Sequence, residues 1–191
     1  MFSMGRFFSV AFFIATVHGQ SLAQTNAISC SDIEIKRGEA LTKQDVGMLG
    51  EYATKYFHQC RTLRSKPEIS IAMGEIASVL RIENKFTDAL TQSQECIKYE
   101  YLSLGCHIEK ALAMNALGLK SEAKEVLKTG RMVLGQLSEV ASHEFAVAEV
   151  MRSKGKSNEY EMQIRSAKSR LATAERMGAF LKTVEKSMGV S

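Results

Sequence analysis

Residues 70–103, SIAMGEIASVLRIENKFTDALTQSQECIKYEYLS, and residues 104–137, LGCHIEKALAMNALGLKSEAKEVLKTGRMVLGQL, are consecutive 34-residue segments that nearly repeat each other. When one segment is laid on the other, apolar and turn-forming residues coincide: Ala77 with Ala111, Leu80 with Met114, and Asn84 with Gly118. A period of 34 residues is typical of a helix–turn–helix unit that stacks on its copies to form a solenoid. The stretch therefore predicts a helical array, an architecture used mostly to bind other chains.

The composition also favours helix. The chain is 45% hydrophobic and 24% charged, with one proline and no tryptophan. It is rich in Ala, Leu, Met, Lys and Glu, whose side chains lose little freedom in a helix. We expect an all-α fold, a short α-solenoid of antiparallel helix pairs with a long C-terminal helix. The net charge of +4 is a mild excess that does not indicate a nucleic-acid partner.

The clearest single repeat is AMNALGLKSEA, residues 113–123, which resembles a tetratricopeptide repeat. The chain departs from that family in lacking the large aromatic residue early in the first helix. The proline that closes the repeat is also missing, except at Pro67. The resemblance implies a concave groove that binds a protein or peptide.

The first helix of each pair would line that groove, at positions turned away from the second helix. These positions are Gly74, Ser78, Arg81, Ile108, Leu112 and Asn115. Relatives that hold a terminal carboxylate line the groove with several Lys, Arg and Asn residues. Only Arg81 and Asn115 match in kind, so a mixed polar and apolar groove is expected; the alternative is that these residues form a solvated face.

The repeats are expected over residues 42–137, beginning with a degenerate unit. In that unit Thr42 caps a helix, Gly50 begins a turn, and a second helix covers residues 53–64. The next helix has a stronger start, because Ser65 and Glu68 can form a capping box around Pro67.

Residues 138–191 are predicted to be C-terminal capping helices. One helix covers residues 138–152, a flexible connection covers 153–158, and a long helix with a narrow apolar seam follows from 159. The first half of that long helix would cap the stack, and its second half could extend to another chain.

Residues 1–23 have the pattern of a secretory signal peptide. Arg6 precedes the apolar run FFSVAFFIATV at 7–17, and Ala23 ends a small-residue cleavage site. The run is shorter than the roughly 20 apolar residues that span a bilayer, and no later segment approaches that length. We expect a periplasmic or secreted protein with no integral membrane segment after cleavage. Residues 24–41 show no helical period and predict an N-terminal arm.

Export makes disulfides the expected state of the four cysteines. Cys96 and Cys106 lie near the facing ends of two consecutive helices, about five residues from the turn between them, which predicts that they bond. Cys30 would then bond to Cys60 and fix the arm to the first repeat.

No catalytic, metal-binding or cofactor-binding pattern is recognisable. His58, His107 and His143 are not paired on one helix face, and the chain lacks the glycine-rich and nucleophile motifs of common enzymes. The sequence predicts a non-catalytic binding or assembly module of the cell envelope. The alternatives are a structural oligomer assembled through residues 159–188 and an enzyme subunit with an unrecognised site.

Overall fold

The computed structural model describes residues 28–190. The predicted signal peptide and the first four residues of the predicted arm lie outside this range. The described part contains seven helices and no strand, which confirms the all-α prediction. The helices are α1 Cys30–Lys43, α2 Val46–Cys60, α3 Lys66–Ile82, α4 Phe86–Tyr99, α5 Leu104–Ala116, α6 Lys120–Ser153 and α7 Ser157–Ser187.

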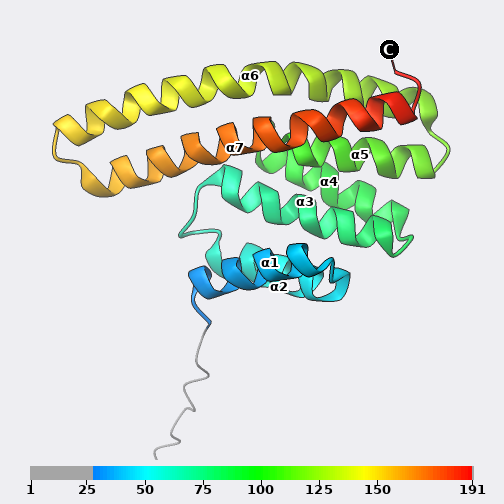
Figure 1. Cartoon of the computed structure of the whole chain (residues 1–191), viewed down its shortest axis with the longest axis horizontal. Coiled ribbons are helices and arrows are strands. Elements are labelled where there is room, and N and C mark those ends of the chain that lie inside the picture. The colour runs from blue at the N-terminus through cyan, green and yellow to red at the C-terminus, as the bar shows by residue number, and fades with distance from the viewer. Residues whose placement is uncertain (1–27, 191) are drawn as a thin grey trace, which may run out of the picture.

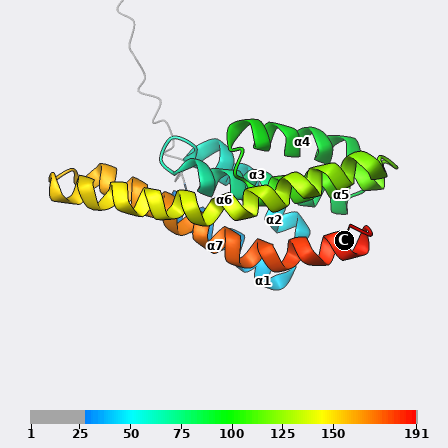
Figure 2. The same cartoon turned by 90° about the horizontal axis from the view of Figure 1, so that it is seen from above.

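Consecutive helices pack side by side as hairpins, and the pairs stack into a short solenoid (Figures 1 and 2). The 34-residue period is visible in the turns within the pairs, because Asn84 and Gly118 both have positive φ, 61° and 83°. The amide after each of them closes the same hydrogen bond, Lys85 to the carbonyl of Leu80 at 2.8 Å and Leu119 to that of Met114 at 2.9 Å. These turns define the chain as a tetratricopeptide-like helical-repeat protein.

Small residues lie where the two helices of a pair cross. Ala77 and Ala111, one period apart, are fully buried, and so are Ala89 and Ala123 on the return helices. Larger side chains fill the spaces between pairs, in one cluster around Tyr56 and another that contains leucines of α5, α6 and α7. Because alanine permits a close approach of the backbones, the repeat pattern in the sequence also records the packing.

The expected N-terminal arm is instead helix α1 from Cys30 onward. Ser29 caps it by accepting from the amide of Asp32 at 3.1 Å. Its buried face consists of Ile33, Arg37 and Ala40, which do follow a helical spacing. The helical period is hidden in the sequence because an arginine occupies the middle buried position.

The first repeat is therefore α1 with α2, and its predicted register is wrong. The turn lies at Gln44, with φ of 55°, and Asp45 caps α2 by accepting from the amide of Met48 at 2.9 Å. Gly50, the predicted turn, lies inside α2. A Cβ atom there would lie 3.1 Å from Val79 Cγ1, so glycine permits close contact between α2 and α3 rather than a turn.

Helix α6 continues through the predicted boundary at residue 138. The separate helix expected over 138–152 is the second half of a single 34-residue helix. Gly130 is buried within this helix, where an added Cβ atom would lie 3.4 Å from Leu104 Cδ1 and 3.6 Å from His107 Cβ of α5. Glycine at this position permits close packing of α6 on α5.

The long C-terminal helix is present as α7, which returns antiparallel to α6 and also contacts α3 and α5. Its second half packs within the chain, since Leu181 and Val184 are buried against α5 and α6, and Ser166 and Ala167 of its first half are buried as well. The first half forms the outer part of a hairpin with α6 (Figure 1). The second half, which was expected to extend to another chain, is therefore part of the stack. None of the described helices is long and apolar enough to cross a membrane.

Both predicted disulfides are present. Cys30 bonds to Cys60 and joins the first turn of α1 to the end of α2, and Cys96 bonds to Cys106 and joins α4 to α5. Cys60, Cys96 and Cys106 are fully buried. In the loop-entropy account, bridges of this size each stabilise the fold by roughly 2–4 kcal/mol.

Candidate functional site

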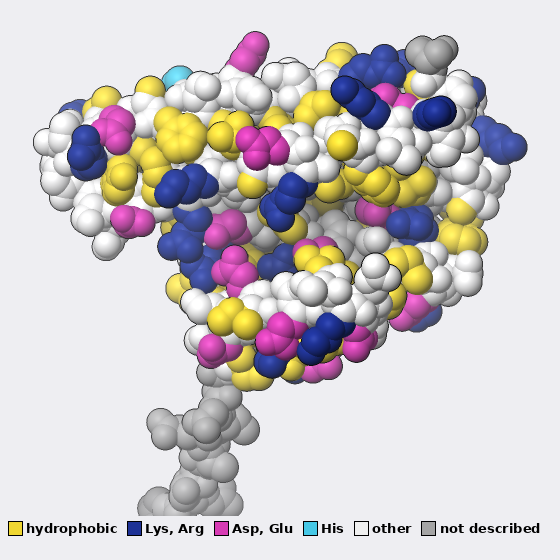
Figure 3. All heavy atoms as spheres, viewed as in Figure 1, with side chains coloured by type: hydrophobic (Ala, Val, Ile, Leu, Met, Phe, Trp, Pro, Cys, Tyr) yellow, Lys and Arg dark blue, Asp and Glu magenta, His cyan; other side chains and the backbone are white. Residues whose placement is uncertain are grey.

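A cleft of about 270 Å³ lies among α3, α5 and α7. Figure 3 shows the hollow between an upper layer, formed by α6 and α7, and a lower layer that carries α1. The lining residues come from five helices and the loop between α4 and α5: Leu41, Pro67, Ser70, Ile71, Gly74, Glu75, Ser78, Glu100, Leu102, Ser103, Gly105, Glu109, Leu137, Arg170, Thr173, Arg176 and Met177. The surface of the cleft is mostly apolar.

The hollow exists because α3 presents a stripe of small residues to it. Ser70, Gly74 and Ser78 recur every four residues, which places them on one face of the helix. Gly105 provides a similar gap on α5, opposite the Met177 side chain of α7. Larger side chains at these positions would occupy the cleft, so the small residues leave this space open.

Two ion pairs follow the same side of the stack. Arg37 of α1 donates to Glu75 of α3 at 2.8 Å, and Arg81 of α3 donates to Glu109 of α5 at 2.7 Å. Glu75 and Glu109 are 34 residues apart and occupy the same position of their repeats. Each glutamate is thus neutralised by an arginine of the preceding odd-numbered helix, and Arg81 is already engaged with a carboxylate of its own chain.

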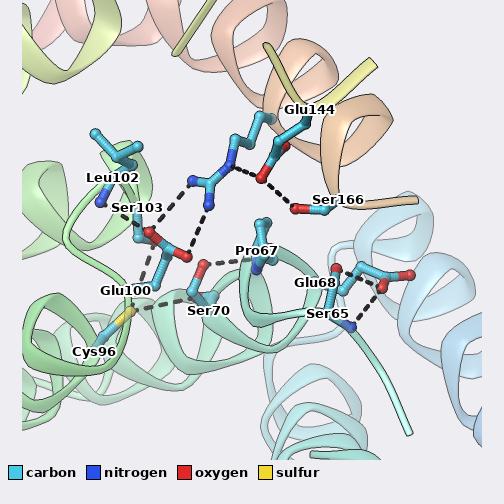
Figure 4. A network of polar contacts seen from close by, with 11 residues as sticks. Ser65, Pro67, Glu68, Ser70, Cys96, Glu100, Leu102, Ser103, Glu144 and Ser166 are labelled. Atoms are coloured by element: carbon cyan, nitrogen blue, oxygen red, sulfur yellow. Dashed lines mark hydrogen bonds and ion pairs between the residues drawn. The ribbon is translucent and has the colours of Figure 1, made fainter. Parts of the chain in front are cut away.

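Arg170 connects α7 to the rest of the molecule at one end of the cleft. Its terminal nitrogens donate to both carboxylate oxygens of Glu100, at 3.3 and 3.2 Å, and its Nε donates to Glu144 at 3.1 Å. Glu144 also accepts from Ser166 Oγ at 2.9 Å, and Glu100 from the amide of Leu102 at 3.2 Å. Figure 4 shows Glu100 and Glu144 on opposite sides of this network.

All three charged side chains of this network are nearly buried, with exposed fractions of 11% for Arg170, 10% for Glu100 and 12% for Glu144. Glu144 Oε2 is buried and has no hydrogen-bond partner among the described residues. The Arg170 guanidinium therefore neutralises two nearly buried carboxylates, those of Glu100 and Glu144.

Two of the six predicted groove residues, Gly74 and Ser78, line the cleft. Arg81 lies beside them, where its Nη2 is 3.4 Å from Ser78 Oγ. Ile108 is fully buried in the core and cannot contact a partner, which corrects that assignment. Leu112 packs against the same core, and Asn115 is half-buried outside the cleft.

The sequence reasoning missed the wall formed by α7 and the two repeat-equivalent glutamates. The glutamates could have been found, because Glu75 and Glu109 coincide when the sequence is shifted by one period. The residues of α7, such as Thr173 and Met177, could not, since their position depends on how a helix outside the repeat pattern folds back.

Two titratable side chains outside the cleft, His107 and Tyr56, are buried. His107 is 3% exposed and its Nε2 lies 2.9 Å from the carbonyl of Tyr101, and burial holds its pKa below the usual value. Burial, with Glu34 and Glu68 nearby, raises the pKa of Tyr56 to about 12. The Arg37 guanidinium lies 4.4 Å from the centre of the Tyr56 ring. Among residues 28–190, no group of three or more His, Cys, Asp or Glu side chains could hold a metal ion.

Comparison with known proteins gives little beyond this architecture. No protein-family model matches the sequence, and no curated protein matches it. Among solved structures, the TPR2B-domain:pHsp70-complex of yeast Sti1 is similar at a TM-score of 0.47 and 18% sequence identity, covering 74% of this chain and 97% of that chain. A likeness at this level does not identify a partner.

Proposed function

We propose that this protein is an exported, non-catalytic binding module that holds a segment of a partner protein in the cleft among α3, α5 and α7. The observation that carries the proposal is an open, mostly apolar cleft, one wall of which is a stripe of small residues on α3. Clefts of this kind are the default location of a ligand in a protein of unknown function.

The charges around the cleft favour an apolar segment over a terminal carboxylate. Arg37, Arg81 and Arg170 each donate to a glutamate of the chain itself. To reach any of these three arginines, an incoming carboxylate would have to displace one of these glutamates, which are nearly buried. The other arginine of the lining, Arg176, is exposed and donates to the carbonyl of Ala172. Apolar side chains of a partner would instead cover the apolar walls, with a favourable free energy of about 25 cal/mol per Å² of buried surface.

Export is supported by two features. Two disulfides are expected in an oxidising compartment, and the sequence of residues 1–23 has the pattern of a signal peptide. N-terminal sequencing of the protein recovered from the periplasm or medium of its own host should begin at Gln24. A protein retained inside the cell with its first residues intact would contradict export.

The partner can be identified by photo-crosslinking in the living host. A photoreactive residue at Thr173 faces the cleft, whereas the same residue at Thr183 lies on an exposed part of α7. Both threonines donate from Oγ1 to the carbonyl four residues earlier, so the two replacements perturb α7 alike. We expect a discrete protein adduct from position 173 and none from position 183. Equal adducts at both positions would contradict binding in the cleft.

A further inference from the structure

The disulfide between Cys96 and Cys106 lies directly behind one wall of the cleft. The Sγ atoms of Cys96 and Cys106 are 3.4 and 3.6 Å from the carbonyl oxygen of Ser70. Ser103 donates from Oγ to Cys106 Sγ at 3.3 Å, and a Cβ atom at Gly74 would lie 3.4 Å from the same sulfur. Ser70, Gly74 and Ser103 all line the cleft, and Figure 4 shows Cys96 in contact with Ser70 and Ser103. The bridge therefore packs against lining residues from both α3 and the loop between α4 and α5.

The bridge also closes the loop that carries Glu100. Backbone hydrogen bonds follow one another through this loop: the amide of Glu100 donates to the carbonyl of Cys96 at 2.9 Å, that of Ser103 to Glu100 at 3.0 Å, and that of Cys106 to Ser103 at 3.1 Å. Each of these bonds spans only three or four residues, so they shape the loop locally. The covalent bond joins its two ends and so fixes the position of Glu100 relative to α4 and α5.

Glu100 is the residue through which this loop contacts the opposite wall. Both of its carboxylate oxygens accept from Arg170 of α7, which also lines the cleft. A second ion pair from this part of α7 joins Arg165 to Glu68 of α3 at 3.8 Å, but the Arg165 side chain is 42% exposed, so that pair contributes little. The position of α7 at this end of the cleft therefore depends on Glu100, and that of Glu100 depends on the bridge.

One covalent bond thus supports both walls of the cleft. We propose that Cys96 and Cys106 are positioning residues of the binding site, and that the cleft takes its binding shape only when their disulfide has formed. This proposal rests on the function proposed above. Formation of the bridge converts two thiols to one disulfide and passes two electrons and two protons to the disulfide of an oxidant by thiol–disulfide exchange. In a reducing cytosol the chain would carry the two thiols, so it would bind its partner only after export.

The disulfide between Cys30 and Cys60 provides a matched control. It joins α1 to α2, and neither of its cysteines lines the cleft. Its cysteines are 30 residues apart, against 10 for the other bridge, so in the loop-entropy account its removal destabilises the fold at least as much. Loss of global stability therefore does not explain an effect that is confined to removal of the bridge between Cys96 and Cys106.

Hydrogen exchange of the purified chain tests the support of α7. Cys96→Ala with Cys106→Ala should raise the exchange rate of residues 165–177, relative to residues 127–137 of α6 in the same molecule, by at least about tenfold. Cys30→Ala with Cys60→Ala should leave this ratio as in wild type. Glu100→Ala, which keeps the bridge, should raise the ratio as well, because the bridge acts on α7 through Glu100; this variant decides the question if the first one does not fold. An unchanged ratio in Glu100→Ala, or in the folded Cys96→Ala, Cys106→Ala variant, would overturn the proposal.

Photo-crosslinking in the host tests the effect on binding. With the photoreactive residue at position 173, the amount of adduct per molecule of recovered protein should fall by at least about tenfold in the Cys96→Ala, Cys106→Ala variant and stay unchanged in the Cys30→Ala, Cys60→Ala variant. Equal adduct from the first variant and wild type would overturn the proposal. If wild type itself gives no adduct from position 173, the proposed binding in the cleft is refuted, and the exchange ratios then decide separately whether the bridge supports α7.

Discussion

Replacement of Arg170 by leucine should destabilise the fold far more than replacement of any exposed arginine. The guanidinium donates to Glu100 and Glu144, and leucine leaves both carboxylates without a counter-charge. The side chains of Glu100 and Glu144 are only 10% and 12% exposed, so water cannot take over the lost contacts. Breaking a buried ion pair from one side typically costs about 3–5 kcal/mol.

The lower end of that range is the better estimate here. Glu100 keeps the hydrogen bond from the amide of Leu102, and Glu144 keeps that from Ser166. We therefore expect a loss of about 3 kcal/mol in the free energy of unfolding. For a domain whose total is about 5–15 kcal/mol, this loss would be plain in a urea titration followed by circular dichroism.

Arg152→Leu is the matched control on the same hairpin. Arg152 pairs with Glu149, but the two side chains are 66% and 55% exposed, so the loss should be at most about 0.5 kcal/mol. Adding Glu100→Gln and Glu144→Gln to Arg170→Leu should recover about 2 kcal/mol, because neutral amides tolerate burial better than unpaired charges. Equal losses for Arg170→Leu and Arg152→Leu would refute the view that this network attaches α7 to the body.

Three further outcomes are expected from the packing and the titratable groups. Gly135 lies within α6 with open space around it, so Gly135→Ala should stabilise the fold by about 0.5–1 kcal/mol. Gly50→Ala should destabilise the fold by about 1 kcal/mol, because the new Cβ atom would lie 3.1 Å from a methyl group of Val79. Thermal melts that rank the two variants in the opposite order would contradict this packing. The pKa of His107 is lowered in the folded state, so its contribution to the free energy of unfolding should be present above pH 6.5 and lost as the pH falls below 6.5. In urea titrations, His107→Gln should lose less stability than wild type as the pH is lowered from 6.5. The pKa of Tyr56 is raised to about 12 from an ordinary value of 10, so the free energy of unfolding should fall by about 2–3 kcal/mol as the pH rises from 10 to 12. Tyr56→Phe should lose less stability over the same pH range, and equal losses in the two proteins would contradict the assigned burial.

Features determined by local chemistry were predictable from the sequence. Ser65 and Glu68 form the expected capping box, with the Glu68 carboxylate 3.0 Å from the Ser65 amide. The 34-residue period located the turns at Asn84 and Gly118 because positive φ values favour such residues. The disulfide between α4 and α5 followed from the antiparallel packing of two consecutive helices.

The errors arose where a residue's role depends on a distant partner. Arg37 hid helix α1, since its burial is compensated by Glu75, 38 residues further along the chain. Gly50 has the sequence character of a turn residue, but it lies inside α2, where Val79 of the next helix approaches too closely for a larger side chain. A sequence pattern indicates which side of a helix is apolar. It does not indicate which neighbouring residue neutralises a buried charge, or which neighbouring helix approaches so closely that only glycine fits.

The cleft was only half predictable for the same reason. Gly74 and Ser78 belong to a repeat helix, so their direction followed from the expected stack. The opposite wall depends on α7, which contacts the loop before α5 through Arg170 and Glu100, 70 residues apart. No periodicity connects two positions of that kind.

The most direct test of binding in the cleft is the affinity of the partner segment identified by crosslinking for two variants of α7. Isothermal titration should show that Thr173→Phe, which places a large side chain in the cleft, weakens binding by at least about tenfold, or 1.4 kcal/mol. Thr183→Phe, which removes the same type of backbone hydrogen bond on the exposed side, should bind as wild type does. Unchanged affinity for Thr173→Phe, or equal losses in both variants, would contradict the cleft as the binding site.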